Sequence, residues 1–188
     1  MIVWRKRSRQ VEELGKVDFK GERIIIFIDH ANIFHPCQEL GVRIDYRKFK
    51  ELMTQKSYLV GAFMYLGMPD KISAKKEKFL KYLTEMAGYT IQTRPLKVLP
   101  PGTTKQRGID IFIYKDIVEL AEEDAYDKAV LVSGDADFVD AVRKLKALKK
   151  RFVIWSFRKS LSKLLRKEAG EENIRYIDNI LKDISRQE

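Results

Sequence analysis

The sequence predicts a three-layer α/β/α domain with a mostly parallel central sheet. Short apolar runs alternate with amphipathic segments along the chain, the pattern of strands that alternate with helices. The run at residues 24–28 consists only of Ile and Phe, as expected for a strand buried on both faces, and such strands are typical of parallel sheets. A chain of 188 residues with 45% apolar content suits one domain with its own core.

The chain opens with a segment of weak periodicity and mixed charge. We expect residues 1–21 to form a basic arm or a short helix, and residues 22–188 to form the domain. After the first strand we expect a short helix to about residue 40. Pro36 must lie in the first turn of that helix or break it, because proline has no N–H to donate. Asp45 is placed to cap the second helix.

The remaining elements follow from periodicity and from turn residues. Ser73 opens a long amphipathic helix, and Gly88 is a suitable residue to end it. Residues 94–108 hold three prolines and two glycines, so we expect a loop there, longer than is usual in a compact domain. The expected strands are residues 23–28, 58–65, 89–93, 130–132, 151–155 and 174–176. The expected helices are residues 46–54, 73–87, 109–123, 160–169, one that starts near residue 135, and a terminal helix.

The net charge of +10 is distributed unevenly along the chain. Residues 110–140 hold ten acidic and two basic side chains, whereas residues 141–167 hold eleven basic and no acidic ones. Such segregation indicates a basic surface for a polyanion, although solvated, lysine-rich helix faces would give the same pattern. The basic side chains that we expect to contact nucleic acid are Lys105, Arg107, Arg143, Lys144, Arg158, Lys159 and Lys163.

Other features exclude some classes of protein. No apolar run approaches the roughly 18–20 residues of a membrane span, and the first residues lack the apolar stretch of a secretory signal. The single cysteine, Cys37, excludes an internal disulfide and fits a reducing compartment. We therefore expect a cytoplasmic protein without a membrane partner, and we leave a homodimer open.

Carboxylates stand where strands end. Asp29 ends the first strand, Asp135 follows the strand at residues 130–132, and Asp137 lies two residues further on. Asp110 lies in the first turn of a helix whose start should face the same edge of the sheet. Like charges so close together repel unless a cation lies between them. Because all the ligands are oxygens, Mg²⁺ or Mn²⁺ is the expected ion.

Each of these residues also has a simpler interpretation. Asp29 could serve simply as a cap of the helix that follows it, with no role in a metal site. The same holds for the pair Asp135 and Asp137. Asn32 could position substrate or a metal-bound water, or could simply form a turn. Asp116 falls within the apolar stripe of its helix, about 9 Å along the axis from Asp110. It is better explained as a buried hydrogen-bonding brace than as a metal ligand, because a buried carboxylate needs a partner.

Three motifs in order resemble the NYN domain family, a branch of the PIN-like nucleases. They are Phe27-Ile28-Asp29-His30-Ala31-Asn32, then Arg107-Gly108-Ile109-Asp110 through Asp116, and Ser133-Gly134-Asp135-Ala136-Asp137-Phe138. The resemblance spans about residues 23–179 and departs from the family pattern at Gly170, where an acidic residue would be expected. It implies a PIN-like α/β/α fold and metal-dependent RNA cleavage. Asp29, Asp110, Asp135 and Asp137 then form the acidic cluster, and Asn32 and Ser133 are its neighbours.

The expected function is hydrolysis of RNA phosphodiester bonds with Mg²⁺ or Mn²⁺, and the expected substrate is single-stranded RNA. The alternative is a catalytically weak or inactive NYN-fold module that binds RNA or protein and acts in regulation. A phosphatase with Asp29 as nucleophile is disfavoured because position 31, where a second carboxylate is usual, is Ala31. No Gly-x-Gly-x-x-Gly follows a strand, which excludes the common dinucleotide-binding motif.

Overall fold

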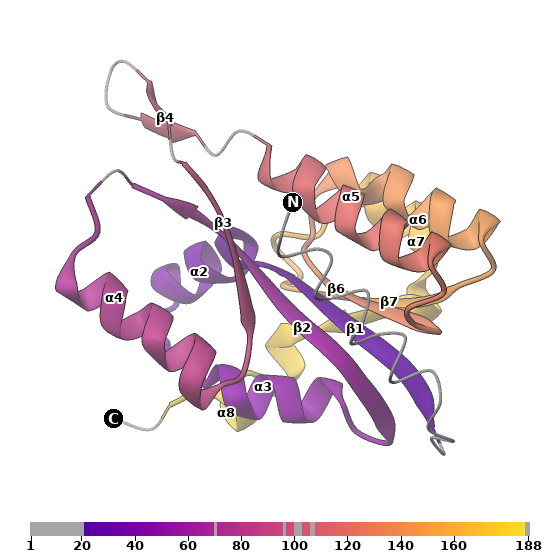
Figure 1. The fold of residues 1–188 in the computed structure, drawn as a ribbon, viewed down its shortest axis with the longest axis horizontal. Helices are drawn as coiled ribbons and strands as arrows, with labels where there is room; N and C mark the ends of the chain where they lie inside the picture. The colour runs from indigo at the N-terminus through magenta and orange to yellow at the C-terminus, as the bar shows by residue number, and fades with distance from the viewer. Residues whose placement is uncertain (1–20, 70, 96, 100–102, 106–107, 187–188) are drawn as a thin grey trace.

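The computed structural model describes residues 21–69, 71–95, 97–99, 103–105 and 108–186. Its centre is a six-stranded sheet in the order β3-β2-β1-β6-β7-β8, and every neighbouring pair is parallel (Figure 1). The predicted α/β fold with a parallel sheet is thereby confirmed. The strands are β1 Glu22–Asp29, β2 Ser57–Met68, β3 Thr90–Pro95, β6 Lys128–Val132, β7 Arg151–Ser156 and β8 Ile174–Tyr176.

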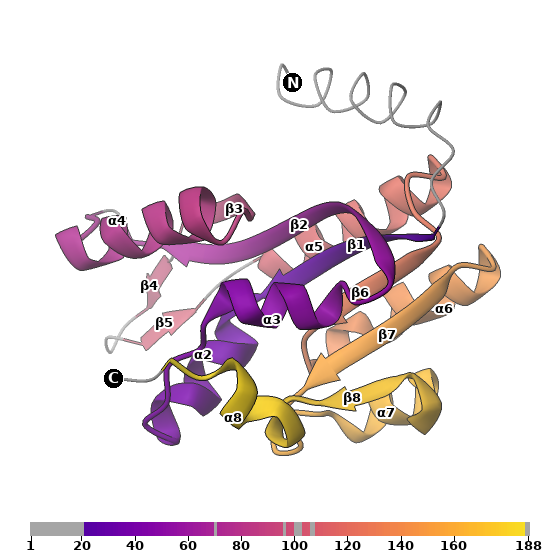
Figure 2. The same cartoon turned by 90° about the horizontal axis from the view of Figure 1, so that it is seen from below.

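Helices cover both faces of the sheet (Figures 1 and 2). One face is covered by α5 Ile109–Glu122, α6 Val139–Ala147 and α7 Lys163–Ala169. The other face is covered by α2 His30–Glu39, α3 Tyr46–Met53, α4 Ala74–Lys81 and α8 Leu181–Ile184. The side chains of β1 alternate between the two cores, since Ile25 and Phe27 join the first and Ile24, Ile26 and Ile28 join the second. This explains why β1 is apolar at every position.

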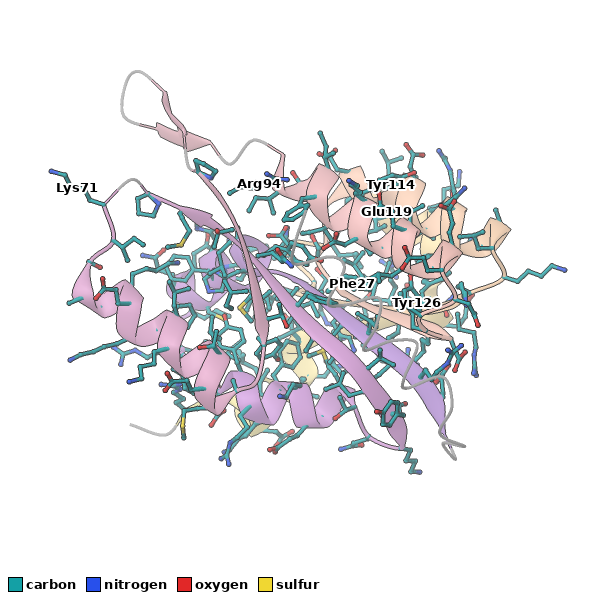
Figure 3. The ribbon with its side chains drawn as sticks, viewed as in Figure 1. Phe27, Lys71, Arg94, Tyr114, Glu119 and Tyr126 are labelled. Atoms are coloured by element: carbon teal, nitrogen blue, oxygen red, sulfur yellow. The ribbon has the colours of Figure 1, made fainter. Side chains whose placement is uncertain are left out.

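Aromatic rings fill the centre of the first core. Phe27 of β1 lies close to Tyr126 (Figure 3). Their ring centroids are 6.0 Å apart and their planes are at 67°. Phe63 of β2 stacks on Phe27 with ring centroids 5.9 Å apart. The hydroxyl of the fully buried Tyr126 donates to the carbonyl of Ile117 at 2.7 Å, so its one polar group is satisfied. These contacts fix α5 over the centre of the sheet.

The strand order places a crevice between β1 and β6. From β1 the chain builds outward through β2 to β3, and from β6 it builds outward in the opposite direction through β7 to β8. Connections from the two central strands therefore leave toward opposite sides at their carboxyl ends. Such a switch in strand order is where parallel α/β sheets bind ligands.

Several elements differ from the sequence prediction at their ends. β2 runs three residues further, to Met68, and the expected loop after residue 94 contains an antiparallel hairpin, β4 Lys97–Leu99 with β5 Thr103–Lys105. The hairpin extends beyond the end of the sheet (Figure 1). α4 passes into a π-helical turn, η1 Tyr82–Met86, and a 3-10 turn, η2 Ala136–Phe138, precedes α6. The tail is built of turns η3 Glu171–Asn173 and η4 Ile177–Ile180 around β8.

The prediction for Pro36 is wrong. Pro36 is the seventh residue of α2, past the first turn, and the helix continues through it to Glu39. The residues after it still form helical bonds, because Leu40 N–H donates to the Pro36 carbonyl at 3.0 Å. Only the bond that residue 36 would have donated to the Asn32 carbonyl is lost. The loss of one hydrogen bond near its end does not break α2, because Ile33 and Cys37 of this helix are buried in the core.

Candidate acidic site at the carboxyl edge of the sheet

Asp29 is the most deeply placed carboxylate of this edge. It ends β1, caps α2 and is 4% exposed. Its Oδ1 accepts from the N–H of Ala31 at 3.2 Å, and its Oδ2 accepts from Asn32 Nδ2 at 3.2 Å and from Ser133 Oγ at 3.4 Å. Burial raises the pKa of Asp29, and these hydrogen bonds oppose the rise. Asp29 thus both caps α2 and forms part of the acidic site.

The loop after β6 is tied to Asp29 from the other strand. Ser133, fully buried, donates to Asp29 and accepts from the N–H of Asp135 at 3.3 Å. Gly134 N–H donates to Asn32 Oδ1 at 3.0 Å. Asn32 therefore bonds to both strand ends with the two ends of one amide. Asp135 in turn caps η2, accepting from the Asp137 N–H at 3.1 Å.

Gly134 is required by a close approach of two segments. A Cβ at this position would collide with the carbonyl oxygen of Ser160 and with Ser156 Oγ. The Gly134 carbonyl also accepts from the N–H of Ser162 at 2.8 Å. The loop that holds Asp135 is therefore packed directly against the segment before α7.

Asp110 reaches the edge from α5. Gly108 has φ +85°, a left-handed conformation that allows the chain to turn into the helix immediately before Asp110. Asp110 is partly buried, and its pKa is raised to about 6, first by desolvation and then by the negative charges of Asp29, Asp135 and Asp137. Asp29, Asp135 and Asp137 are thus close enough to Asp110 to oppose its ionisation, and the four carboxylates lie at one edge of the sheet, as the parallel sheet predicted.

A pocket of about 780 Å³ opens at this edge. Asp29, Asp110 and Asp135 line it together with Asn32 and Gly134. The other lining residues are His30, Ala31, Phe34, His35, Pro36, Gly67, Lys76, Ala136, Ser160 and Ser162. The volume is within the range of ligand-binding pockets. Its acidic groups come from the ends of β1 and β6 and from the start of α5, and its one lysine is Lys76 of α4.

The chemistry of this donor set fits a hard divalent cation. Its ligands would be carboxylate oxygens, the type that Mg²⁺ and Mn²⁺ prefer, and a cation would relieve the repulsion that raises the pKa of Asp110. Among the described residues, however, no three Asp, Glu, His or Cys side chains are close enough as they stand to hold one ion. Side chains of the cluster would have to move toward the ion on binding.

Three residues predicted for the acidic site lie outside the pocket lining, and one of them, Ser133, is the buried donor to Asp29 described above. Asp116 is 1% exposed on α5, and its Oδ2 accepts from the hydroxyl of Tyr65 at 2.7 Å. This supports its interpretation as a buried brace. Asp137 is exposed and, although its charge reaches Asp110, it does not line the pocket. Asp135 is therefore the better placed of the two carboxylates in that loop.

Comparison with known proteins decides the family. The model of the NYN domain matches residues 23–174. The chain belongs to the NYN domain family. It is 30% identical over 167 residues to the Low amplitude and bright protein LabA of Synechococcus elongatus, an alignment that covers 85% of each chain. A crystal structure of a protein of unknown function from Vibrio parahaemolyticus matches with a TM-score of 0.74 at 26% identity, over 91% of this chain and 99% of the other.

Membership of the NYN family gives this chain a PIN-like nuclease fold, and the acidic site lies at the crevice of that fold. None of the described helices is long and apolar enough to cross a membrane. The predicted arm lies outside the described residues, except for Gly21.

Several of the predicted basic side chains are paired with acidic or aromatic side chains of this NYN domain. Arg143 pairs with Asp140 at 3.0 Å and Glu168 at 3.1 Å, and Lys144 pairs with Glu122 at 2.8 Å. Lys159 pairs with Glu39, and the Arg158 guanidinium lies 3.8 Å from the ring centroid of Tyr176. Arg107 is outside the described residues, and Lys105 is described only as part of strand β5. Lys159 and Lys163 flank Ser160 and Ser162 of the pocket wall, so these two lysines are nearest to the site along the chain.

The pocket contains residues that the sequence did not single out. Phe34, Lys76, Ser160 and Ser162 line it, and none belongs to the three acidic motifs. His30, which also lines the pocket, is 8% exposed and contacts the rings of Phe79 at 5.3 Å and Tyr46 at 6.0 Å. The only sequence signal for Phe34 is its position one helical turn after His30, which places both on one side of α2.

Proposed function

We propose that this NYN domain is a divalent-metal-dependent ribonuclease that hydrolyses phosphodiester bonds of single-stranded RNA. The observation that supports it most is the raised pKa of Asp110, which results from burial and from three further carboxylates brought from β1 and from the loop after β6. A protein that keeps four carboxylates so close at the crevice of its fold loses stability to their repulsion. Binding of a cation would recover that loss.

The residues of the site have separate roles in this proposal. Asp29, Asp110 and Asp135 would hold Mg²⁺ or Mn²⁺, with Asp137 as a further charge. A bound ion of this kind supplies Lewis-acid polarisation of a phosphate oxygen and a water of lowered pKa. Asn32 and Ser133 fix the side chain of Asp29 through hydrogen bonds of 3.2 and 3.4 Å. They also connect it to the backbone of the loop that holds Asp135, so they are positioning residues.

The direct test is cleavage of short single-stranded RNAs of varied sequence by the purified protein with Mn²⁺, with Mg²⁺, and with a chelator. We expect cleavage with either ion and none with the chelator. Asp135→Asn keeps the shape of the side chain but removes its charge, so we expect a loss of at least about a hundredfold in rate, the size typical when one important electrostatic interaction is removed. The same substitution should weaken Mn²⁺ binding measured by calorimetry.

Asp140→Asn is the matched control. Asp140 is an exposed carboxylate on α6 that pairs with Arg143 and does not line the pocket, so its loss should leave cleavage and metal binding unchanged. If Asp135→Asn behaves like Asp140→Asn in both measurements, the nuclease proposal is wrong. RNA binding without cleavage, unaffected by both variants, would instead identify a binding module that keeps the fold.

A further inference from the structure

The pocket continues beyond the carboxylates to a wall with a different chemistry. On this side it is lined by Phe34, His35 and Pro36 of α2 and by Lys76 of α4. Of the large apolar side chains that are exposed in the described part of the chain, Phe34 is the one aromatic residue, with 46% of its surface accessible. A single exposed apolar side chain is ordinary on a protein surface, but this ring lines the same pocket as Asp29, Asp110 and Asp135, where a ligand of the acidic site can reach it.

The ring of Phe34 is held in place from beneath. It stacks on the imidazole of His30, with centroids 5.6 Å apart and an interplanar angle of 23°. His30 is itself 8% exposed and rests on Phe79 at 5.3 Å. Phe34 is therefore at the exposed end of an aromatic cluster that extends through His30 and Phe79 into the core, and the exposed His35 packs edge-on against it at 5.6 Å. A ring supported in this way loses little conformational entropy when a planar ligand adds to it.

A cation accompanies the ring. The ammonium group of Lys76 lies 5.6 Å from the ring centroid of Phe79, and Lys76 lines the same pocket as Phe34. An exposed aromatic ring, an ammonium group and an acidic site that line one pocket match the parts of a nucleotide. The base stacks on a ring, and a phosphate contacts an ammonium group. A purely apolar ligand would leave Lys76 and the carboxylates without partners.

We propose that Phe34 is the stacking platform for one base of a single-stranded RNA, beside the phosphate that the acidic site cleaves, and that Lys76 contacts a neighbouring phosphate. This inference deepens the proposed function and rests on it for the position of the phosphate. Stacking on a phenyl ring tolerates any base. The subsite therefore selects for unpaired nucleotides rather than for sequence, because a base within a duplex cannot present its face.

The test is a double-substitution cycle between the protein and the RNA. Asp135→Asn serves as the non-cleaving background, and affinity is measured for a set of oligonucleotides in which each position in turn lacks its base. Phe34→Leu keeps an apolar side chain but removes the ring, and we expect it to weaken binding of the intact oligonucleotide about tenfold. Phe34→Trp should restore binding. At one abasic position, Phe34→Leu should have no further effect, because the stacked base is already missing.

Leu40→Ala is the matched control, since Leu40 is an exposed apolar residue directly after the last residue of the same helix but does not line the pocket. It should leave every affinity unchanged, and circular dichroism should show that all variants are folded. The platform is refuted if Phe34→Leu binds like its background, if its effect is the same at every abasic position, or if the protein binds no RNA.

The result also separates this inference from the proposed function. Coupling at one position in a protein that does not cleave RNA would keep the platform and reject the nuclease. Cleavage without coupling at any position would keep the nuclease and reject the platform. A Lys76→Gln variant that lowers the salt dependence of binding would support the phosphate contact, whereas an unchanged salt dependence would exclude it.

Discussion

Each acidic residue at the ends of β1 and β6 has two roles. Asp29 Oδ1 accepts from the N–H of Ala31, and Asp135 Oδ1 accepts from the N–H of Asp137. Both carboxylates therefore cap the turn or helix that follows, and both also line the pocket. Cap and site are alternatives when the sequence is read alone, but in space they are compatible, because a carboxylate has two oxygens and the cap uses one.

At the scale of single residues, the four carboxylates predict an unusual pH dependence of stability. The pKa of Asp110 is raised from 3.8 to about 6 by burial and then by Asp29, Asp135 and Asp137. The folded state therefore holds this proton more tightly than the unfolded chain. The contribution of Asp110 to stability is full below about pH 4 and falls as the pH rises to about 6.

Asp110→Asn should accordingly stabilise the metal-free protein at pH 7.5 and lose that advantage near pH 4. Because Asp110 is only partly buried, solvent screening reduces the expected gain to about 1 kcal/mol. Urea unfolding at several pH values measures it. A saturating divalent cation should reverse the order of the two proteins, since it would stabilise the ionised carboxylate. A gain that is independent of pH would contradict this account of Asp110.

Gly134 gives a second prediction for a single residue. Gly134→Ala would force a methyl group into the carbonyl of Ser160, and we expect a loss of about 1–3 kcal/mol in the free energy of unfolding, the usual range for overpacking. Gly41→Ala is the control, because a methyl group there meets no atom within 4 Å and adds only the strain of φ +66°. Equal losses in the two variants would show that the contact with Ser160 is not tight.

The residues of the site differ in how far sequence predicts them. Asp29, Asp135 and Asp110 are predictable, because a parallel sheet brings strand ends to one edge whatever the detailed packing. Phe34 and Lys76 are not predictable, because their presence in one pocket depends on the distance between α2 and α4. That distance is set by side chains such as His30 and Phe79 that reach across from each helix.

At the scale of elements, α5 is fastened to β2 by a polar contact in an apolar layer. The Tyr65 hydroxyl donates to Asp116 at 2.7 Å, and both residues are buried. Phe112 of α5 packs edge-on against Tyr65 at 5.7 Å and lies under the guanidinium of Arg94 at 4.2 Å. These contacts set the position of α5 and therefore of Asp110 at its start.

Tyr65→Phe should destabilise the protein by about 1–3 kcal/mol, because it takes a hydrogen-bond donor from a buried carboxylate. Tyr126→Phe is the matched control, since that hydroxyl is also buried and also forms a 2.7 Å bond, but to the neutral carbonyl of Ile117. We expect the control to lose about 1 kcal/mol, the value for a neutral acceptor. Thermal or urea unfolding of the two variants compares them, and an equal loss would show that the charge of Asp116 adds nothing.

Elements are predictable from sequence where one signal dominates. The caps Asp45 and Ser73 both accept from backbone N–H groups of the helices that they precede, at 3.0 and 3.3 Å. The hairpin of β4 and β5 was not predicted, because three-residue strands within a segment rich in proline and glycine give no period-two pattern. The π-helical turn after α4 is not predictable for another reason. Its residues have ordinary helical periodicity, and what distinguishes it is the hydrogen bond from the Ala87 N–H to the carbonyl of Tyr82, five residues earlier, at 2.9 Å.

For the whole molecule, the net charge of +10 is less informative about RNA binding than the positions of the charged side chains in the fold. The segment of residues 141–167 is basic in sequence, but the fold brings Glu122 and Glu168 beside its first helix, α6, which itself carries Asp140. The separation of charge along the chain is thus partly removed in space, because sequence distance does not limit which helices pack together. The basic residues after β7 remain next to the pocket through Ser160 and Ser162.

This arrangement predicts which lysines contribute to RNA binding. The double variant Lys159→Gln and Lys163→Gln should lower the slope of log affinity against log salt by about 1.4, that is, about 0.7 for each phosphate of a single strand that a lysine no longer neutralises. Arg143→Gln with Lys144→Gln removes the same charge from α6, which contributes no residue to the pocket lining, and should leave the slope nearly unchanged. Titrations of a fluorescent oligonucleotide at several salt concentrations compare the pairs. If both pairs lower the slope equally, RNA responds to the net charge of the domain, and the two lysines beside the pocket do not form a track that leads the strand to the acidic site.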